Sequence, residues 1–218
     1  FIHVDLAQKH DHCAVAMSHV SRFVNVKVTD AYSQPAPIVE VDAVRYWTPT
    51  ADKSVDFTEV RDYILSLRSA GFNIRLCTFD RWNSHDMMQQ LKQYGISTET
   101  LSVAKKHYDD MAMVVLEERL NGPNIKLLVD ELLQLKIMRD KVDHPRKGSK
   151  DLADAVCGSV YNAISRTRKN NNDEIDIHTY DSMRRQERNN EEEIRLNVVR
   201  PPRMPKDLSD VLDGMEIV

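Results

Sequence analysis

Apolar residues alternate with polar ones, or form short runs, through the first 50 positions of the chain. These segments lie at 1–6, 12–20, 23–29 and 38–47. Short segments of this kind are typical of β-strands, and the polar residues 8–11 between the first two predict a hairpin. We therefore expect the N-terminal quarter of the chain to form neighbouring antiparallel strands.

From residue 56 onward, apolar positions recur every three or four residues, as they do in amphipathic helices. Asp56 and Glu59 have the spacing of a capping box. We therefore expect a helix from about 57 to Ala70 that stops at Gly71. The same patterns predict these further elements: strands at 72–80 and 96–103, and helices at 84–95, 108–121, 125–138 and from a Ser149 cap to about 166.

The order of these elements predicts the fold class. Strands come first, then helix and strand alternate, and helices end the series, which is the order of an α/β domain. The sheet should be mixed, with antiparallel strands at the front and parallel strands behind. We expect one central sheet flanked by helices.

The apolar period fails after about residue 167, where charged, Asn-rich and Pro-containing segments follow. Such sequence cannot bury enough apolar surface to offset the entropy of ordering it. We therefore expect a folded domain at 1–166 and a flexible charged tail at 167–218. Within the tail, 207–218 has apolar residues at helical spacing, so it is either a docking helix for a partner or part of the flexible tail.

Composition narrows the class of protein further. The 218 residues carry a formal net charge of −4 and are 41% hydrophobic, which suits a folded domain with one core. No apolar run approaches the ~18 residues that a membrane-spanning helix needs. The three cysteines lie in apolar stretches, so we expect reduced core residues in an intracellular protein. Because the chain starts at Phe1 inside an apolar run, we expect a domain cut from a longer polypeptide.

Four aspartates are the candidate catalytic residues. Asp5 and Asp80 lie at or near the ends of predicted strands, and Asp151 and Asp154 are three residues apart at the start of the last predicted helix. Each could simply cap a turn or a helix. Together, however, they form an all-oxygen set that suits Mg²⁺ or Mn²⁺. With two ions, such a site would hydrolyse phosphodiester bonds by in-line displacement.

Basic residues near these acids are candidate contacts to a nucleic-acid backbone. Residues 139–150 contain five Lys or Arg against two Asp. Such a segment either positions phosphates or is a solvated loop. The candidate residues are Lys105, Lys106, Arg146, Lys147 and Lys150. The chain has no P-loop and no G-x-G-x-x-G motif, so we expect no ATPase site of its own.

Three motifs resemble a known family. HVDLA lies at the first strand, TFDRWNS follows a later strand, and VDHPRKGSKDLADAV opens the last helix. In this order they resemble the nuclease domain of large terminase subunits, the DNA-packaging motors of tailed bacteriophages, within the ribonuclease H-like superfamily. The resemblance covers residues 1–166.

The resemblance implies a metal-dependent endonuclease that binds two divalent ions and cuts concatemeric double-stranded DNA during genome packaging. Asp5 and Asp80 match the acids of the first and second motifs, and the helix acid is either Asp151 or Asp154. The implied partners are DNA, an ATPase domain of the same polypeptide, the portal and the small terminase subunit. The implied location is the cytoplasm of an infected bacterial host.

Two alternatives stay open at this point. The domain is either a nuclease or a non-catalytic docking module of the packaging motor whose acids are structural. Within the nuclease class, a Holliday-junction resolvase or transposase-like enzyme has the same superfold.

Overall fold

The computed structural model describes residues 1–7, 12–29, 31–80, 84–138, 141–145 and 148–167. Arg146 and Lys147 lie outside the described residues, as do the predicted tail and its docking helix at 207–218. No helix in the described part of the chain is both long enough and apolar enough to cross a membrane.

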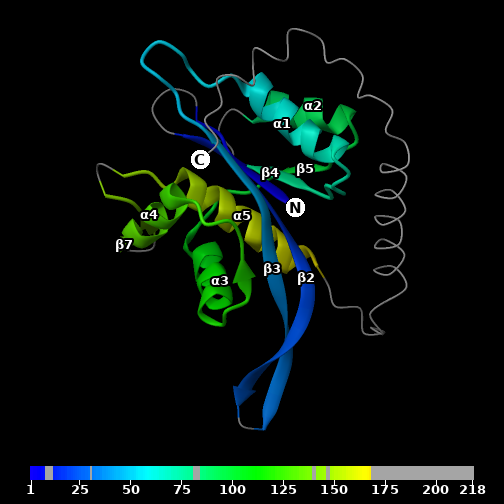
Figure 1. The fold of residues 1–218 in the computed structure, drawn as a ribbon, viewed down its shortest axis with the longest axis vertical. Helices are drawn as coiled ribbons and strands as arrows, with labels where there is room; N and C mark the ends of the chain where they lie inside the picture. Colours follow the sequence, from blue (N-terminus) through cyan, green and yellow to red (C-terminus); the bar gives the residue numbers. More distant parts are fainter. Residues whose placement is uncertain (8–11, 30, 81–83, 139–140, 146–147, 168–218) are drawn as a thin grey trace, which may run out of the picture. The chain divides into compact units, whose positions relative to one another are not determined.

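Six strands form one mixed sheet in the order β5-β4-β1-β2-β3-β6 (Figure 1). β1, β2 and β3 pair antiparallel, whereas β1, β4 and β5 pair parallel and β6 runs parallel to β3. This arrangement confirms the expected α/β fold with an antiparallel front and a parallel rear. The strand bounds are β1 (Ile2–Asp5), β2 (Cys13–Thr29), β3 (Tyr32–Trp47), β4 (Cys77–Phe79), β5 (Thr98–Thr100) and β6 (Leu120–Asn121).

β2 and β3 are longer than the sequence pattern predicts. The separate strands expected at 12–20 and 23–29 form one continuous strand, with an irregularity between Val20 and Arg22 where the pattern breaks. The extra residue at a bulge shifts the alternation of side chains without ending the strand, so the pattern looks like two strands. The two strands extend as a ribbon beyond the rest of the sheet (Figure 1).

Alternating side chains of the sheet contribute to two separate cores. Cys13, Val15 and Met17 belong to the core formed with α1 (Phe57–Ser69) and α2 (His85–Gln93). Ala14 and Ala16, between them in sequence, belong to the core on the opposite face. Helices therefore cover both faces of the sheet, as in a three-layer α/β domain.

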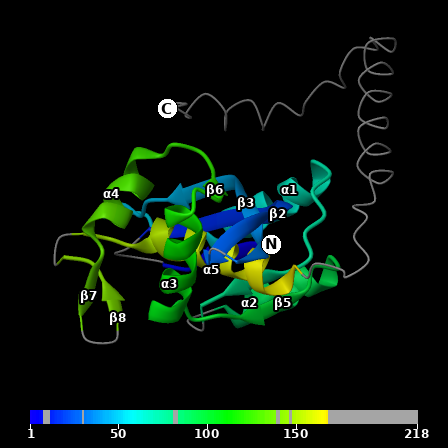
Figure 2. The ribbon, with the colours of Figure 1, turned by 90° about the horizontal axis from the view of Figure 1, so that it is seen from below.

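The second core is formed with α3 (Lys105–Leu116), α4 (Lys126–Gln134) and α5 (Asp151–Arg166). A separate two-stranded sheet, β7 (Lys136–Met138) and β8 (Lys141–Asp143), lies beside α4 (Figure 2). The three cysteines are all buried and free, which confirms their predicted place in the core.

Helix ends differ from the sequence-based expectation at three places. The helix expected to continue to residue 121 ends at Leu116, because Glu118 adopts a positive φ of 55° that turns the chain into β6. The helix expected at 125–138 ends at Gln134, because β7 pairs with β8 instead. The last helix is capped by Lys150 and not by Ser149, whose hydroxyl donates to Glu131.

Candidate active site

Asp5 and Asp80 lie at the same edge of the sheet. β1 and β4 are parallel neighbours in which Val4 pairs with Phe79, so the residues that follow each of these positions are adjacent. The backbone amide of Asp80 donates to the carbonyl of Val4 at 3.4 Å. The topology therefore brings together two carboxylates that are 75 positions apart in the sequence.

α5 adds its first turn to this edge. His3 of β1 packs so closely on Gly158 that a Cβ there would overlap the His3 ring. Buried hydrogen bonds fix the helix on the sheet, from Ser159 to Ser18 at 2.8 Å and from Asn162 to Thr78 at 2.7 Å. These contacts determine where the two acids of the first turn lie.

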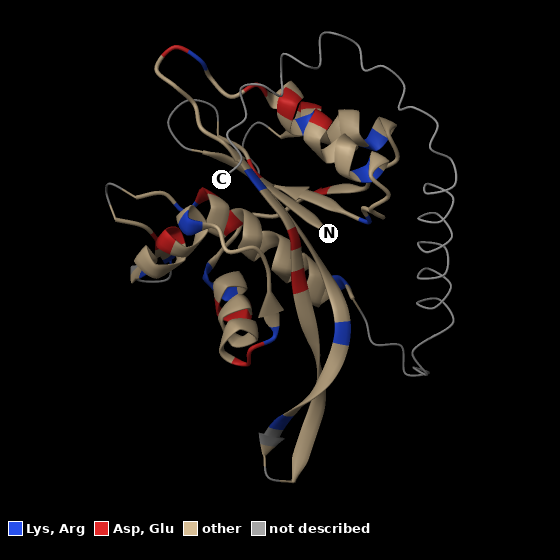
Figure 3. Cartoon of the chain, in the orientation of Figure 1, with Lys and Arg blue, Asp and Glu red and all other residues tan. Residues whose placement is uncertain are grey.

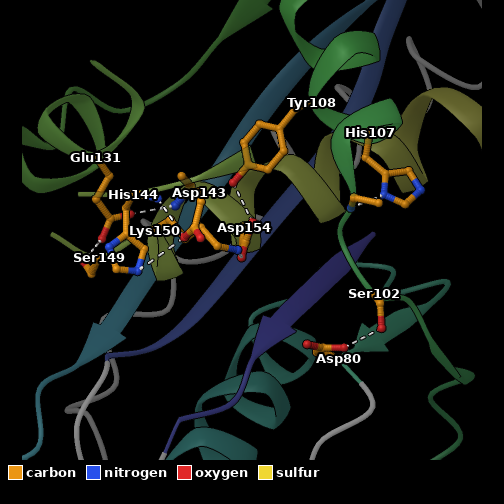
Figure 4. Close-up of polar contacts among 12 residues, drawn as sticks. Asp80, Ser102, His107, Tyr108, Glu131, Asp143, His144, Ser149, Lys150 and Asp154 are labelled. Carbon is orange, nitrogen blue, oxygen red and sulfur yellow. Dashed lines mark hydrogen bonds and ion pairs between the residues drawn. The ribbon is translucent and has the colours of Figure 1, made fainter. Parts of the chain in front are cut away.

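Asp151 and Asp154 have different surroundings. The carboxylate of Asp151 accepts the backbone amide of His12 at 2.8 Å, just before β2. Asp154 is buried, with 8% of its surface exposed. One of its oxygens accepts the Tyr108 hydroxyl at 2.6 Å, and the other forms an ion pair with Lys150 (Figure 4).

Asp80 also has a hydrogen-bond partner. The hydroxyl of Ser102, in the segment after β5, donates to an Asp80 carboxylate oxygen at 2.6 Å (Figure 4). Ser102 and Tyr108 thus orient two of the acids, although neither stood out in the sequence. Tyr108 occupies an apolar position of a helix period and reads as a core residue, and Ser102 lies in a loop without a motif.

The four acids share one electrostatic environment. Burial raises the pKa of Asp5 well above its ordinary value, and the charges of Asp154, Asp151 and Asp80 raise it further, while Lys150 lowers it. Burial raises the pKa of the Cys13 thiol to about 12, so this cysteine is protonated at neutral pH and is not a thiolate nucleophile. Asp5 therefore lies in a region with an excess of negative charge.

The chemistry of these residues fits a hard divalent cation. All the donors are carboxylate oxygens, and a cation among them would offset the mutual repulsion that raises the pKa of Asp5. The present side-chain positions do not form a finished site, because no three His, Cys, Asp or Glu side chains among the described residues lie in metal-binding proximity. Metal binding therefore requires the carboxylates to approach one another, for example by release of Asp154 from its ion pair with Lys150.

The predicted basic residues Lys105, Lys106 and Lys150 have different surroundings. Lys150 is part of the acid cluster through its ion pair with Asp154, and Lys105 pairs with Asp109 at 2.6 Å within α3. Lys106 is exposed on the same helix. Basic and acidic residues occur close together on α3 and at the start of α5 (Figure 3), with two lysines before two aspartates on α3 and Lys150 before the two acids of α5.

Known proteins resemble this chain in sequence or in fold. No family model matches the chain. An uncharacterized protein of Methanocaldococcus jannaschii is 28% identical over an alignment of 193 residues that covers 83% of this chain and 32% of that protein. The chain thus spans about a third of the length of the curated relative it matches.

Two solved structures have a similar fold. The HK97 bacteriophage large terminase matches with a TM-score of 0.54 and 16% identity, over 74% of this chain and 38% of that one. The large terminase nuclease of thermophilic phage G20c with bound magnesium matches with a TM-score of 0.50 and 13% identity, over 73% and 78%. The chain therefore has the ribonuclease H-like fold of large terminase nucleases, as the sequence motifs implied.

Proposed function

We propose that this chain is a divalent-metal-dependent endonuclease that hydrolyses phosphodiester bonds of double-stranded DNA. The observation that carries the proposal is the convergence of Asp5, Asp80, Asp151 and Asp154 at one edge of a sheet with a terminase nuclease fold. The structure of the phage G20c nuclease with bound magnesium supports the choice of cation.

Asp5 would be one of the residues that hold the two Mg²⁺ or Mn²⁺ ions, because it lies close enough to the other three acids for their charges to raise its pKa. Asp80 would complete the site from the side of β4, and Asp154 or Asp151 from α5. Such cations supply Lewis acidity at phosphorus and make water a better nucleophile at neutral pH.

Residues around the acids prepare the site. Ser102 and Tyr108 donate hydrogen bonds that hold Asp80 and Asp154 in defined orientations. Lys150 offsets part of the negative charge at Asp154. Removal of a group that hydrogen-bonds to a metal-binding side chain typically changes metal affinity or activity 10–100-fold.

The larger assembly is part of the same proposal. The chain covers 38% of the HK97 large terminase, which leaves room for an ATPase domain in the same polypeptide. We place residues 1–166 as the nuclease domain of such a motor and 167–218 as its tail. The nuclease domain would cut concatemeric DNA during packaging, in an assembly with the portal and the small terminase subunit, in the cytoplasm of an infected bacterium.

The test is cleavage of supercoiled plasmid with Mg²⁺, Mn²⁺, Ca²⁺ or EDTA, using the wild-type chain, Asp80→Asn and the control Asp86→Asn. Asp86 is an exposed acid in the first turn of α2 and is not one of the four candidate acids. We expect cleavage with Mn²⁺ or Mg²⁺ that EDTA abolishes. Asp80→Asn should lower the rate more than about 100-fold, because losing a direct ligand should cost more than losing a group that only hydrogen-bonds to one. Asp86→Asn should leave the rate unchanged.

One observation favours the alternative of a non-catalytic docking module. Both carboxylate oxygens of Asp154 have partners within the chain, Tyr108 and Lys150, as those of a structural acid would. The plasmid assay separates the two functions. A folded wild-type chain that cuts no DNA with any of these cations would favour the docking module over the nuclease.

A further inference from the structure

A concave cleft with a volume of about 320 Å³ lies next to the acid cluster. Three segments form it: the beginning of α3, the strand β8 and the residue that precedes α5. Each segment contributes one lysine, Lys105, Lys141 and Lys150, and we call this feature the lysine cleft. The sequence-based candidates included the first and last of these residues and omitted Lys141.

The charge of the lysine cleft is predominantly positive. Its lining contains three lysines and one carboxylate, that of Asp143. Lys105 and Lys150 are ion-paired with Asp109 and Asp154, which lie outside the lining. The Lys141 side chain is exposed and has no ion-pair partner among the described residues, while its backbone pairs with Met138 in the β7–β8 hairpin. A ligand anion would therefore gain most from Lys141, whose ammonium group is not already ion-paired as those of Lys105 and Lys150 are.

The lysine cleft and the acid cluster have two residues in common. Tyr108 lines the cleft and donates its hydroxyl hydrogen bond to Asp154, and Lys150 lines the cleft and pairs with the same carboxylate (Figure 4). An anion bound in the cleft would thus lie directly beside the acid cluster. Lysine ammonium groups bind phosphate as point charges without requiring one fixed geometry.

We propose that the lysine cleft binds a backbone phosphate of the DNA strand beside the bond that is cut, with Lys141 as its principal contact. The inference rests on the proposed nuclease function, because it places this phosphate relative to the acids. Its role is positioning. The lysines hold the backbone so that a neighbouring phosphodiester faces Asp5, Asp80 and Asp154.

The test measures binding of a short DNA duplex in EDTA by fluorescence anisotropy between 50 and 200 mM NaCl. The variants are Lys141→Ala and the control Lys126→Ala. Lys126 is an exposed lysine on α4 that pairs with Asp130 and does not line the cleft. Each lysine that contacts a phosphate contributes about 0.9 to the slope of log affinity against log salt.

We expect Lys141→Ala to weaken binding and to reduce the slope by about 0.9, so that its deficit against wild type shrinks about 3.5-fold from 50 to 200 mM salt. Lys126→Ala should keep the wild-type slope. An unchanged slope in Lys141→Ala, or an equal loss in Lys126→Ala, would overturn the proposal.

Two further results distinguish this proposal from binding of free anions and from the proposed nuclease function. If 10 mM inorganic phosphate protects Lys141 from acylation while a DNA duplex does not, the cleft binds free anions and the DNA proposal is wrong. Because the binding assay contains no divalent cation, it does not depend on cleavage. A reduced salt slope in Lys141→Ala, together with a wild-type chain that cuts no DNA, would support the DNA contact and reject the nuclease function.

Discussion

Asp5 is a carboxyl group whose surroundings oppose its ionisation. Burial and three neighbouring acids raise its pKa in the folded protein above the ordinary value of 3.8. The protonated form is therefore favoured by folding. The stability that this preference supplies is fully present below the unfolded pKa and is lost as pH rises through the folded pKa.

Replacing Asp5 by Asn should remove this loss of stability with rising pH. We expect the free energy of unfolding of wild type, measured with urea in EDTA, to fall between pH 5 and pH 8 more than that of Asp5→Asn. At pH 8 the variant should be the more stable protein, because it has no charge to bury. Asp86→Asn, at an exposed acid, serves as the control. Equal pH dependence in wild type and Asp5→Asn would show that Asp5 does not carry the shifted titration.

At the scale of single elements, α5 depends on a close approach to the sheet. Ala14 and Ala16 present small side chains to it, and Gly158 leaves space for the buried His3 ring. That ring cannot easily move, because its Nδ1 lies 2.8 Å from the Thr78 hydroxyl. The first turn of α5, with its two acids, is positioned by this packing.

Gly158→Ala should therefore destabilise the protein. Alanine would by itself favour the helix by roughly 1 kcal/mol, and overpacking of a core typically costs about 1–3 kcal/mol. The Cβ would overlap the His3 ring, so the cost should be at the upper end of this range, and we expect a net loss of about 2 kcal/mol in urea unfolding. The control Ser165→Ala lies on the exposed side of the same helix and should change little. A Gly158→Ala protein as stable as wild type would show that α5 can move away from β1.

Elements with a clear period were predictable from the sequence, and their ends were less so. Gly71 and Gly95 adopt positive φ of 100° and 74°, where the sequence predicted that α1 and α2 stop. The expected helix at 125–138 shows the opposite case. Its apolar residues fit a helix throughout, and only the pairing of β7 with β8, a tertiary contact, ends α4 at Gln134.

At the scale of the whole molecule, the site assembles from segments that are far apart in the sequence. The sequence predicted that Asp5 and Asp80 lie at or near strand ends, whereas the structure shows that these strands, β1 and β4, are neighbours. The roles of Tyr108, Ser102 and Lys141 do not follow from the sequence. Each depends on how a helix, a loop or a hairpin packs beside the acids, and no local pattern reports that packing.

The central claim is that acids from β1, the end of β4 and the start of α5 form a single cation site. The most direct test is a crystal structure of the chain with Mn²⁺, using anomalous scattering to locate the ion. The account predicts an anomalous peak ligated by Asp5 together with Asp80 or an acid of α5, with Lys150 displaced from Asp154. An Mn²⁺-dependent nuclease whose only anomalous peaks lie away from Asp5 would contradict it.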